Sequence, residues 1–242
     1  MNYQQIRKEF SGVAPYLVPF FKCCSIYYIL WLPEHNQPGL VPALVKCLPT
    51  LCLISFVFFQ GMSNSYNRKI LAGLCFSCIG DALLVWQIAY EELFLLGMAM
   101  FAIAMCLYIS ALGFSPFGVK QLLFCVLVMS TAYAVFIPSL LHRTVMLIAV
   151  GTYIFLLAVA EWRSLASISL EGGAIPWRKI YAAAGISTFV VSDTILGVAK
   201  FIQPILFHRF LVMTTYYTAQ LFISLSVINS HIFMDISTDK IH

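Results

Sequence analysis

Long apolar runs separated by short polar breaks follow one another from Pro15 to Asn229. Each run has about 18 to 23 residues, the length that an α-helix needs to cross a hydrocarbon core of about 30 Å. The pattern predicts an all-α, polytopic membrane protein with eight transmembrane helices. The expected spans are about residues 15–32, 40–60, 70–88, 91–113, 118–139, 144–165, 180–201 and 208–230.

Composition supports this class. Of the 242 residues, 61% are hydrophobic and 10% are charged, whereas soluble domains are about 45–50% apolar and about 25% charged. The spans leave no room for a soluble domain, so residues 1–242 are expected to form one integral membrane domain. Arg7, Lys8 and Glu9 precede the first run without a cleavage-site pattern, which predicts a retained span rather than a signal peptide.

The basic residues in the loops and near the span ends are unevenly divided between the two sides, nine against three. Because basic residues favour the cytoplasmic side, both termini are expected in the cytoplasm. The nine are Arg7, Lys8, Arg68, Lys69, Lys120, Arg163, Arg178, Lys179 and Lys240, and the three are Arg143, Lys200 and Arg209. The net charge of +4 therefore reflects the membrane topology. The sequence has no basic patch with interleaved aromatic residues, so no nucleic-acid partner is predicted.

The eight cysteines all fall within expected spans, where packing is their expected role. Cys75 and Cys78 form a CxxC, but no second CxxC or nearby histidine completes a zinc site, so neither a metal nor another cofactor is predicted. The chain has no GxSxG elbow, P-loop or HExxH motif. These absences disfavour the usual serine hydrolases, ATPases and zinc metalloproteases.

Two aspartates interrupt apolar runs: Asp81 in FSCIGDALLVW and Asp193 in FVVSDTIL. Each lies about 10–12 Å below the expected non-cytoplasmic end of its span, at a rise of about 1.5 Å per residue. Lys46 enters from the same side to a similar depth. Charged side chains inside a span cost about 2.5–3.5 kcal/mol each, so they are expected to face a shared polar interior and not lipid.

Other polar residues are expected at a similar depth in the membrane. Tyr216 and Gln220 lie one turn apart on the last span, and Lys22 is slightly deeper on the first. The alternative is a structural network in which Lys46 only pairs with an aspartate and holds helices together. Glu161 and Arg163, near the end of the sixth span, are expected to extend to the membrane interface.

The segments around the aspartates also suggest an internal duplication. GLCFSCIGDALL from Gly73 and GISTFVVSDTIL from Gly185 share a glycine, an aspartate eight residues later and a leucine, at an offset of 112 residues. The offset corresponds to four helices and predicts a possible 4+4 duplication with parallel halves. Chance similarity between two apolar helices is the alternative.

A pair of buried carboxylates has a specific chemistry. Low dielectric disfavours the charged form and a second carboxylate disfavours double ionisation, so one of the pair is expected to keep its proton. The pair then offers an acid and a base, which suits hydrolysis of an amphiphilic substrate that enters from the bilayer. The same groups would suit a proton-coupled transporter or lipid carrier, and a non-catalytic scaffold is a third possibility.

From Val18 to about Val227 the chain resembles the lysoplasmalogenase family of membrane enzymes, the YhhN-like group of the transmembrane protein 86 A and B type. The matching stretches are KCLP from Lys46, GDALLVW from Gly80, SD at Ser192, FIQP from Phe201 and MTTYYTAQL from Met213. The resemblance implies eight spans, an endoplasmic reticulum location and hydrolysis of the vinyl ether of lysoplasmalogens. The products would be a fatty aldehyde and glycerophosphocholine or glycerophosphoethanolamine.

With this resemblance, Asp81 and Asp193 are the expected catalytic acid and base, without an assignment of which is which. The expected substrate- and water-positioning residues are Lys46, Tyr216, Tyr217, Gln220 and Lys22. Lys46 would either bind the phosphate or neutralise the dyad. One departure is Met105, which stands where family members often have a histidine before a tyrosine, here Tyr108. Oligomeric state, head-group preference and chain-length preference are left open.

Overall fold

The computed structural model of the chain describes residues 3–31, 38–87, 89–168 and 176–228. Within these residues the secondary structure is helical, as the apolar runs predict. The eight helices are α1 (Tyr3–Trp31), α2 (Leu40–Phe59), α3 (Ser65–Trp86), α4 (Glu92–Leu112), α5 (Val119–Leu140), α6 (Thr144–Ser167), α7 (Trp177–Phe201) and α8 (His208–Leu225). The expected span ends at 32, 88 and 230 fall outside the described residues.

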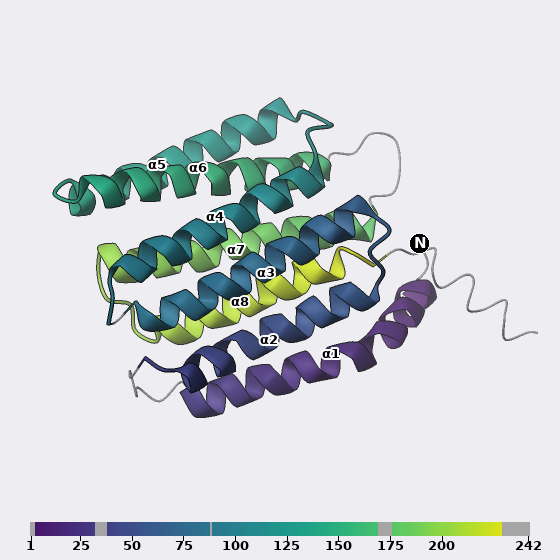
Figure 1. The fold of residues 1–242 in the computed structure, drawn as a ribbon. Helices are drawn as coiled ribbons and strands as arrows, with labels where there is room; N and C mark the ends of the chain where they lie inside the picture. The colour runs from purple at the N-terminus through teal and green to yellow at the C-terminus, as the bar shows by residue number, and fades with distance from the viewer. Residues whose placement is uncertain (1–2, 32–37, 88, 169–175, 229–242) are drawn as a thin grey trace, which may run out of the picture.

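Among the described residues, seven helices are long and apolar enough to cross a membrane. The exception is α8, which has 18 residues and carries Arg209, Tyr216, Gln220 and Ser224. Of these four, Tyr216, Gln220 and Ser224 are buried inside the bundle. The low hydropathy of α8 therefore reflects polar groups that face other helices, and α8 runs alongside the remaining helices over the length of the bundle (Figure 1).

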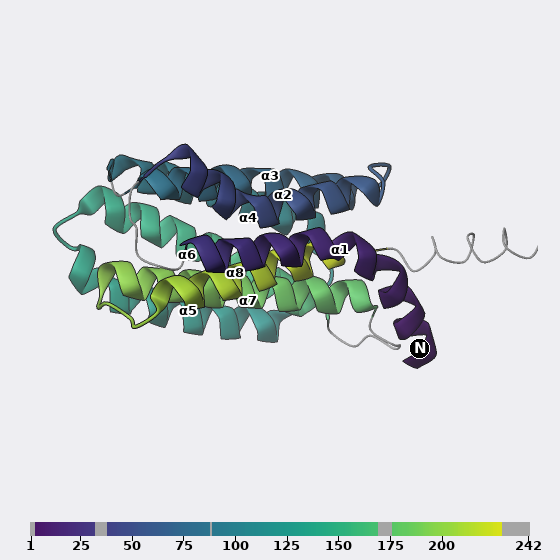
Figure 2. The same cartoon turned by 90° about the horizontal axis from the view of Figure 1, so that it is seen from below.

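Six helices form a closed ring. In order, α2 packs against α3, α3 against α4, α4 against α6, α6 against α7, α7 against α8, and α8 against α2. Helix α1 packs on α2, and α5 packs on α6, at opposite edges of the bundle (Figure 1). Figure 2 shows α2, α3 and α4 in one layer and α7 and α8 in the other. The start of α1 and the end of α8 lie at the same end of the molecule (Figure 1).

Two glycines allow close helix contacts at equivalent places in the two halves. A Cβ on Gly73 of α3 would lie 2.2 Å from Cε1 of Tyr108 on α4. A Cβ on Gly185 of α7 would lie 2.7 Å from Cγ1 of Ile223 on α8. The glycine shared by the two similar segments thus lets α3 approach α4 and α7 approach α8. These contacts agree with an internal duplication, which stays a prediction.

Arg163 contradicts the expectation of an interfacial side chain, because it is fully buried. Its Nε donates to the carbonyl of Gly113 over 2.6 Å, and an Nη donates to the carbonyl of Pro116 over 2.7 Å. These carbonyls follow the last turn of α4, where helix geometry leaves acceptors without partners. Arg163 therefore fastens the α4–α5 connection to α6 instead of extending to the interface.

Candidate functional site

A cavity of about 440 Å³ lies inside the bundle, and each of the eight helices contributes to its lining. Its mouth is at the end where α3 and α7 finish and α4 and α8 begin, since Gln87, Phe201 and His208 line it there. The walls are mainly apolar and aromatic. They include Leu84, Val85, Phe94, Met98, Phe101, Met129, Phe136, Val150, Ile154, Leu157 and Met213.

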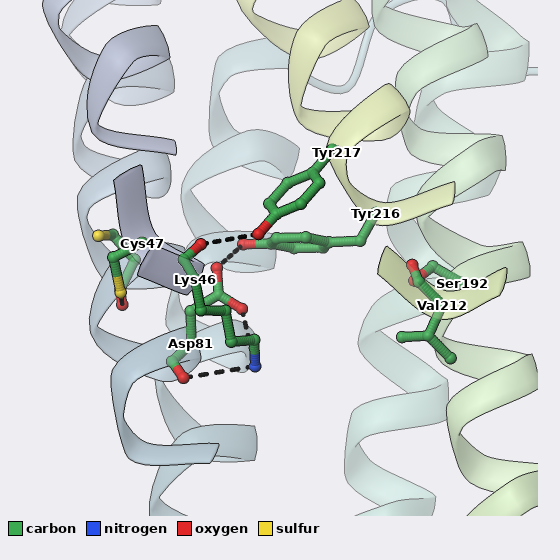
Figure 3. A network of polar contacts seen from close by, with 8 residues as sticks. Lys46, Cys47, Asp81, Ser192, Val212, Tyr216 and Tyr217 are labelled. Carbon is green, nitrogen blue, oxygen red and sulfur yellow. Dashed lines mark hydrogen bonds and ion pairs between the residues drawn. The ribbon is translucent and has the colours of Figure 1, made fainter. Parts of the chain in front are cut away.

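Inside the cavity, three polar side chains from three helices meet and are called here the Asp81 cluster: Lys46 of α2, Asp81 of α3 and Tyr216 of α8 (Figure 3). Nζ of Lys46 lies 3.3 Å from Oδ1 of Asp81. The hydroxyl of Tyr216 donates to Oδ2 of Asp81 over 2.6 Å. Asp81 is 2% exposed, so its charge is balanced by protein groups and not by solvent.

The second aspartate reaches the same cavity from the other side of the ring. Asp193 of α7 lines it and accepts a short hydrogen bond from the hydroxyl of Tyr153 on α6. Among the described residues, Asp193 has no cationic partner within ion-pair distance. The preceding residue, Ser192, donates to the carbonyl of Val212 over 3.0 Å and so ties α7 to α8 beside Asp193 (Figure 3).

Two of the expected positioning residues stand behind the cavity wall. Tyr217 is buried, and its hydroxyl donates to the backbone carbonyl of Lys46 over 2.8 Å (Figure 3). Gln220 is fully buried and accepts a hydrogen bond of 3.2 Å from the hydroxyl of Tyr108. Neither residue is part of the cavity lining. Their contacts are with residues of the surrounding helices, and a role in positioning substrate or water stays a prediction.

The structure does not bring Lys22 to the cavity, and its predicted role in positioning substrate or water stays untested. Lys22 is exposed on α1 and is absent from the cavity lining. Its depth in the first span does agree with a site residue, but depth does not fix the direction in which a helical side chain points. On α1 it is Tyr27, and not Lys22, that faces the cavity.

The structure adds residues that the sequence pattern did not single out. Tyr153 reaches Asp193 from α6, where a lone tyrosine in an apolar helix gives no signal. Lys200, His208 and Arg209 line the mouth of the cavity. In the sequence, Lys200 and Arg209 indicate only the orientation of the chain, although both are assigned to the side on which the mouth lies.

Met105 lies away from the reaction space. It is fully buried in the core of α4 and does not line the cavity. A side chain at this position can influence the Asp81 cluster only through intervening residues.

No metal or redox site emerges within the described residues. They contain no group of three or more histidine, cysteine, aspartate or glutamate side chains placed to hold a metal ion. All eight cysteines are free thiols. Cys47, for example, points its thiol at the carbonyl of Cys78 over 3.4 Å, a contact between α2 and α3.

The arrangement combines a charge-paired carboxylate and a second carboxylate without a cation in one mainly apolar cavity. Lys46 and Tyr216 both favour the ionised form of Asp81, because one is a cation and the other a hydrogen-bond donor. Asp193 has only the hydroxyl of Tyr153, and the charge of Asp81 acts on it. Such a pair can donate a proton from one side of a bound molecule and stabilise a cation from the other.

Comparisons with known proteins agree on one family. Residues 41–227 match the YhhN family. Lysoplasmalogenase TMEM86A of Bos taurus is 39% identical over 221 residues, 90% of each chain. The human lysoplasmalogenase TMEM86A is 36% identical over 221 residues, again 90% of each chain. Lysoplasmalogenase TMEM86B of Sus scrofa is 39% identical over 218 residues, 90% of this chain and 88% of that one. No solved structure matches the chain.

Proposed function

Because the chain belongs to the YhhN family, and its relatives named lysoplasmalogenase match it over about nine-tenths of its length, we propose that it hydrolyses the vinyl ether bond of lysoplasmalogens. The observation that carries the mechanism is the placement of Asp81 and Asp193 in one intramembrane cavity. The enzyme is a lysoplasmalogenase, and its substrate is an alkenyl glycerophospholipid that enters from the bilayer.

The two carboxylates take different roles. Asp193 is the acid, because no cation among the described residues supports its charge and Asp81 lies in the same cavity. Asp81 is the anion that stabilises positive charge and receives a proton from water, because the ammonium group of Lys46 and the hydroxyl of Tyr216 both contact its carboxylate. Lys46 thus neutralises the pair, and the alternative in which it binds phosphate is disfavoured by its contact with Asp81.

The reaction then runs without net change in protons. Asp193 gives its proton to the β carbon of the vinyl ether, whose π electrons form the new C–H bond and leave an oxocarbenium ion. Water adds to the α carbon and loses a proton to Asp81. The hemiacetal gives its hydroxyl proton to Asp193 and breaks the bond to the glycerol oxygen, which takes from Asp81 the proton that came from water. One water is consumed, and an aldehyde and a glycerophospho alcohol leave.

The cavity also suits the two ends of the substrate. Apolar walls such as Met98, Phe101 and Phe136 offer a surface for the hydrocarbon chain. The mouth carries Lys200, His208 and Arg209 at the first turn of α8 and the last turn of α7. Cationic side chains beside a helix N-terminus favour anions, so the phosphate of the head group is placed at the mouth.

The charge distribution supports one orientation in the membrane. The excess of basic residues on one side supports an orientation with both termini in the cytoplasm. The cavity mouth then opens on the non-cytoplasmic side. The family resemblance supports the endoplasmic reticulum as the membrane, and oligomeric state is left open.

The test is fatty-aldehyde release from an alkenyl lysophospholipid by the purified protein, with a matched acyl lysophospholipid as control. Wild type is compared with Asp81→Asn and Asp193→Asn, each checked for folding. Vinyl-ether-specific release that is lost in both variants is the expected result. Release that survives both substitutions would refute the mechanism, and proton flux in liposomes without aldehyde release would favour the transporter.

A further inference from the structure

A second set of buried polar side chains lies one helical turn beyond the Asp81 cluster. Thr50, Ser77 and Gln220 stand four residues from Lys46, Asp81 and Tyr216 on α2, α3 and α8 respectively, each displaced away from the cavity mouth. Four residues make about one helical turn, so each of the three lies one turn from its neighbour in the Asp81 cluster and all three lie at a similar depth in the bundle. All three are fully buried. They are called here the polar layer.

Each member of the polar layer has a polar atom without a hydrogen-bond partner among the described residues. These atoms are Oγ1 of Thr50, Oγ of Ser77 and Nε2 of Gln220. The hydroxyl of Tyr108 is already committed to Oε1 of Gln220 over 3.2 Å. Ser77 neighbours that hydroxyl and Gln220 neighbours the hydroxyl of Tyr216, in both cases outside hydrogen-bond geometry.

Unpartnered buried polar atoms are rare in folded proteins, because each loses its hydrogen bonds to water without replacement. The three residues share the helix faces on which Lys46, Asp81 and Tyr216 meet. Their unpartnered atoms therefore point to a common partner. Internal water fills this role elsewhere, making two to four hydrogen bonds to groups that would otherwise be unsatisfied. The polar layer offers a donor from Gln220 and two hydroxyls that can donate or accept.

We propose that the polar layer binds water and supplies it to the Asp81 cluster during hydrolysis. The inference rests on the proposed function, because hydrolysis consumes one water per turnover. When a lipid chain fills the apolar cavity, bulk water is excluded from the mouth side. A water held behind the Asp81 cluster is then the nearest nucleophile, and it approaches from the side of the base.

The water is tested first without any reaction. Radiolytic hydroxyl labelling modifies side chains that touch bound water, and Tyr108 is the reporter because its hydroxyl contacts Gln220. The purified protein is labelled with the cavity occupied by a non-hydrolysable alkyl-ether lysophospholipid. Labelling of Tyr108 that persists with the lipid bound, and disappears in Thr50→Val/Ser77→Ala/Gln220→Leu, is expected. An unlabelled Tyr108 in the wild type would overturn the proposal.

The single variants provide an independent check through their melting temperatures. If Thr50 and Ser77 hold water, Thr50→Val and Ser77→Ala lower Tm; if their hydroxyls are unpaired, removing them raises Tm. Thr152→Val and Ser55→Ala are matched controls, since both hydroxyls are exposed and bonded within their own helices. A rise in Tm in both polar-layer variants would overturn the proposal.

The supply role is tested by kinetics. Each polar-layer variant is expected to lower kcat about two- to ten-fold, the effect of one neutral hydrogen bond, with KM unchanged. An unchanged kcat in all three would overturn this role. Labelling of Tyr108 in a protein that releases no aldehyde would instead support the water site and refute the proposed function, so the two failures are distinguishable.

Discussion

Tyr216 and Asp81 meet across the bundle, with the phenol hydroxyl on α8 donating to Oδ2 of the carboxylate on α3 over 2.6 Å. Both residues are buried in the lining of the cavity. The Tyr216 ring also packs edge-on against Phe101 and Phe189, which fixes the direction of the hydroxyl. The position of α8 therefore determines whether the Asp81 carboxylate keeps this hydrogen bond inside the cavity.

Tyr216→Phe is expected to lower kcat roughly ten- to a hundred-fold, because a hydrogen bond to a charged group contributes about 1.5–3 kcal/mol. The ring and its packing are kept, so folding should be close to that of the wild type. The measurement is aldehyde release at saturating substrate. Tyr28→Phe is the control, since its hydroxyl contacts Thr214 outside the cavity. A wild-type rate in Tyr216→Phe would show that this hydroxyl has no part in the reaction.

Lys46→Met is expected to destabilise the protein by about 3–5 kcal/mol, because it leaves the Asp81 carboxylate buried without its cation. The double variant Lys46→Met/Asp81→Asn should regain most of that stability and remain inactive. Unfolding in detergent and aldehyde release measure the two properties. Lys22→Met is the matched control, since Lys22 is exposed on α1, and it should keep both stability and activity.

This double variant also decides between the catalytic and structural interpretations of the ion pair. If Lys46 and Asp81 only hold α2 and α3 together, restoring stability restores activity. An active double variant would therefore contradict the assignment of Asp81 as the base.

The depth of the site residues could be predicted because an α-helix rises by a fixed amount per residue. Lys46, Asp81, Asp193 and Tyr216 come from four helices and line one cavity, as equal depth suggested. Lys22 has a similar depth but does not reach the cavity, because rotation about the helix axis is set by packing and α1 lies at the edge of the bundle (Figure 1).

Other features had no local signal. The partner of Asp193, Tyr153, lies forty residues earlier in an unremarkable apolar helix. The helix starts were also misplaced where polar residues precede the apolar run. Helix α3 begins at Ser65 rather than near residue 70, because the side chain of Asn64 accepts a hydrogen bond from the amide of Tyr66 and caps the polar first turn.

Lys200→Gln and Arg209→Gln are each expected to raise KM for alkenyl lysophospholipids about two- to five-fold, the range of a partly exposed ion pair, without lowering kcat. The reason is that the phosphate is placed at the mouth, away from the reacting bond. Lys179→Gln, at the opposite end of α7 from Lys200, is the control. A fall in kcat with unchanged KM would contradict a head-group role for these two residues.

Gly73→Ala is expected to destabilise the protein by about 1–3 kcal/mol or more, because a Cβ would stand 2.2 Å from Cε1 of Tyr108, an aromatic ring in a packed core. The ring can move only by separating α4 from α3, which also displaces the hydroxyl that contacts Gln220. Thermal unfolding in detergent measures the loss. Gly39→Ala is the matched control, because its added Cβ would meet only Pro42 at 3.5 Å, an ordinary contact. Equal stability of the two variants would show that the α3–α4 interface tolerates a methyl group, contrary to the close contact between Gly73 and Tyr108.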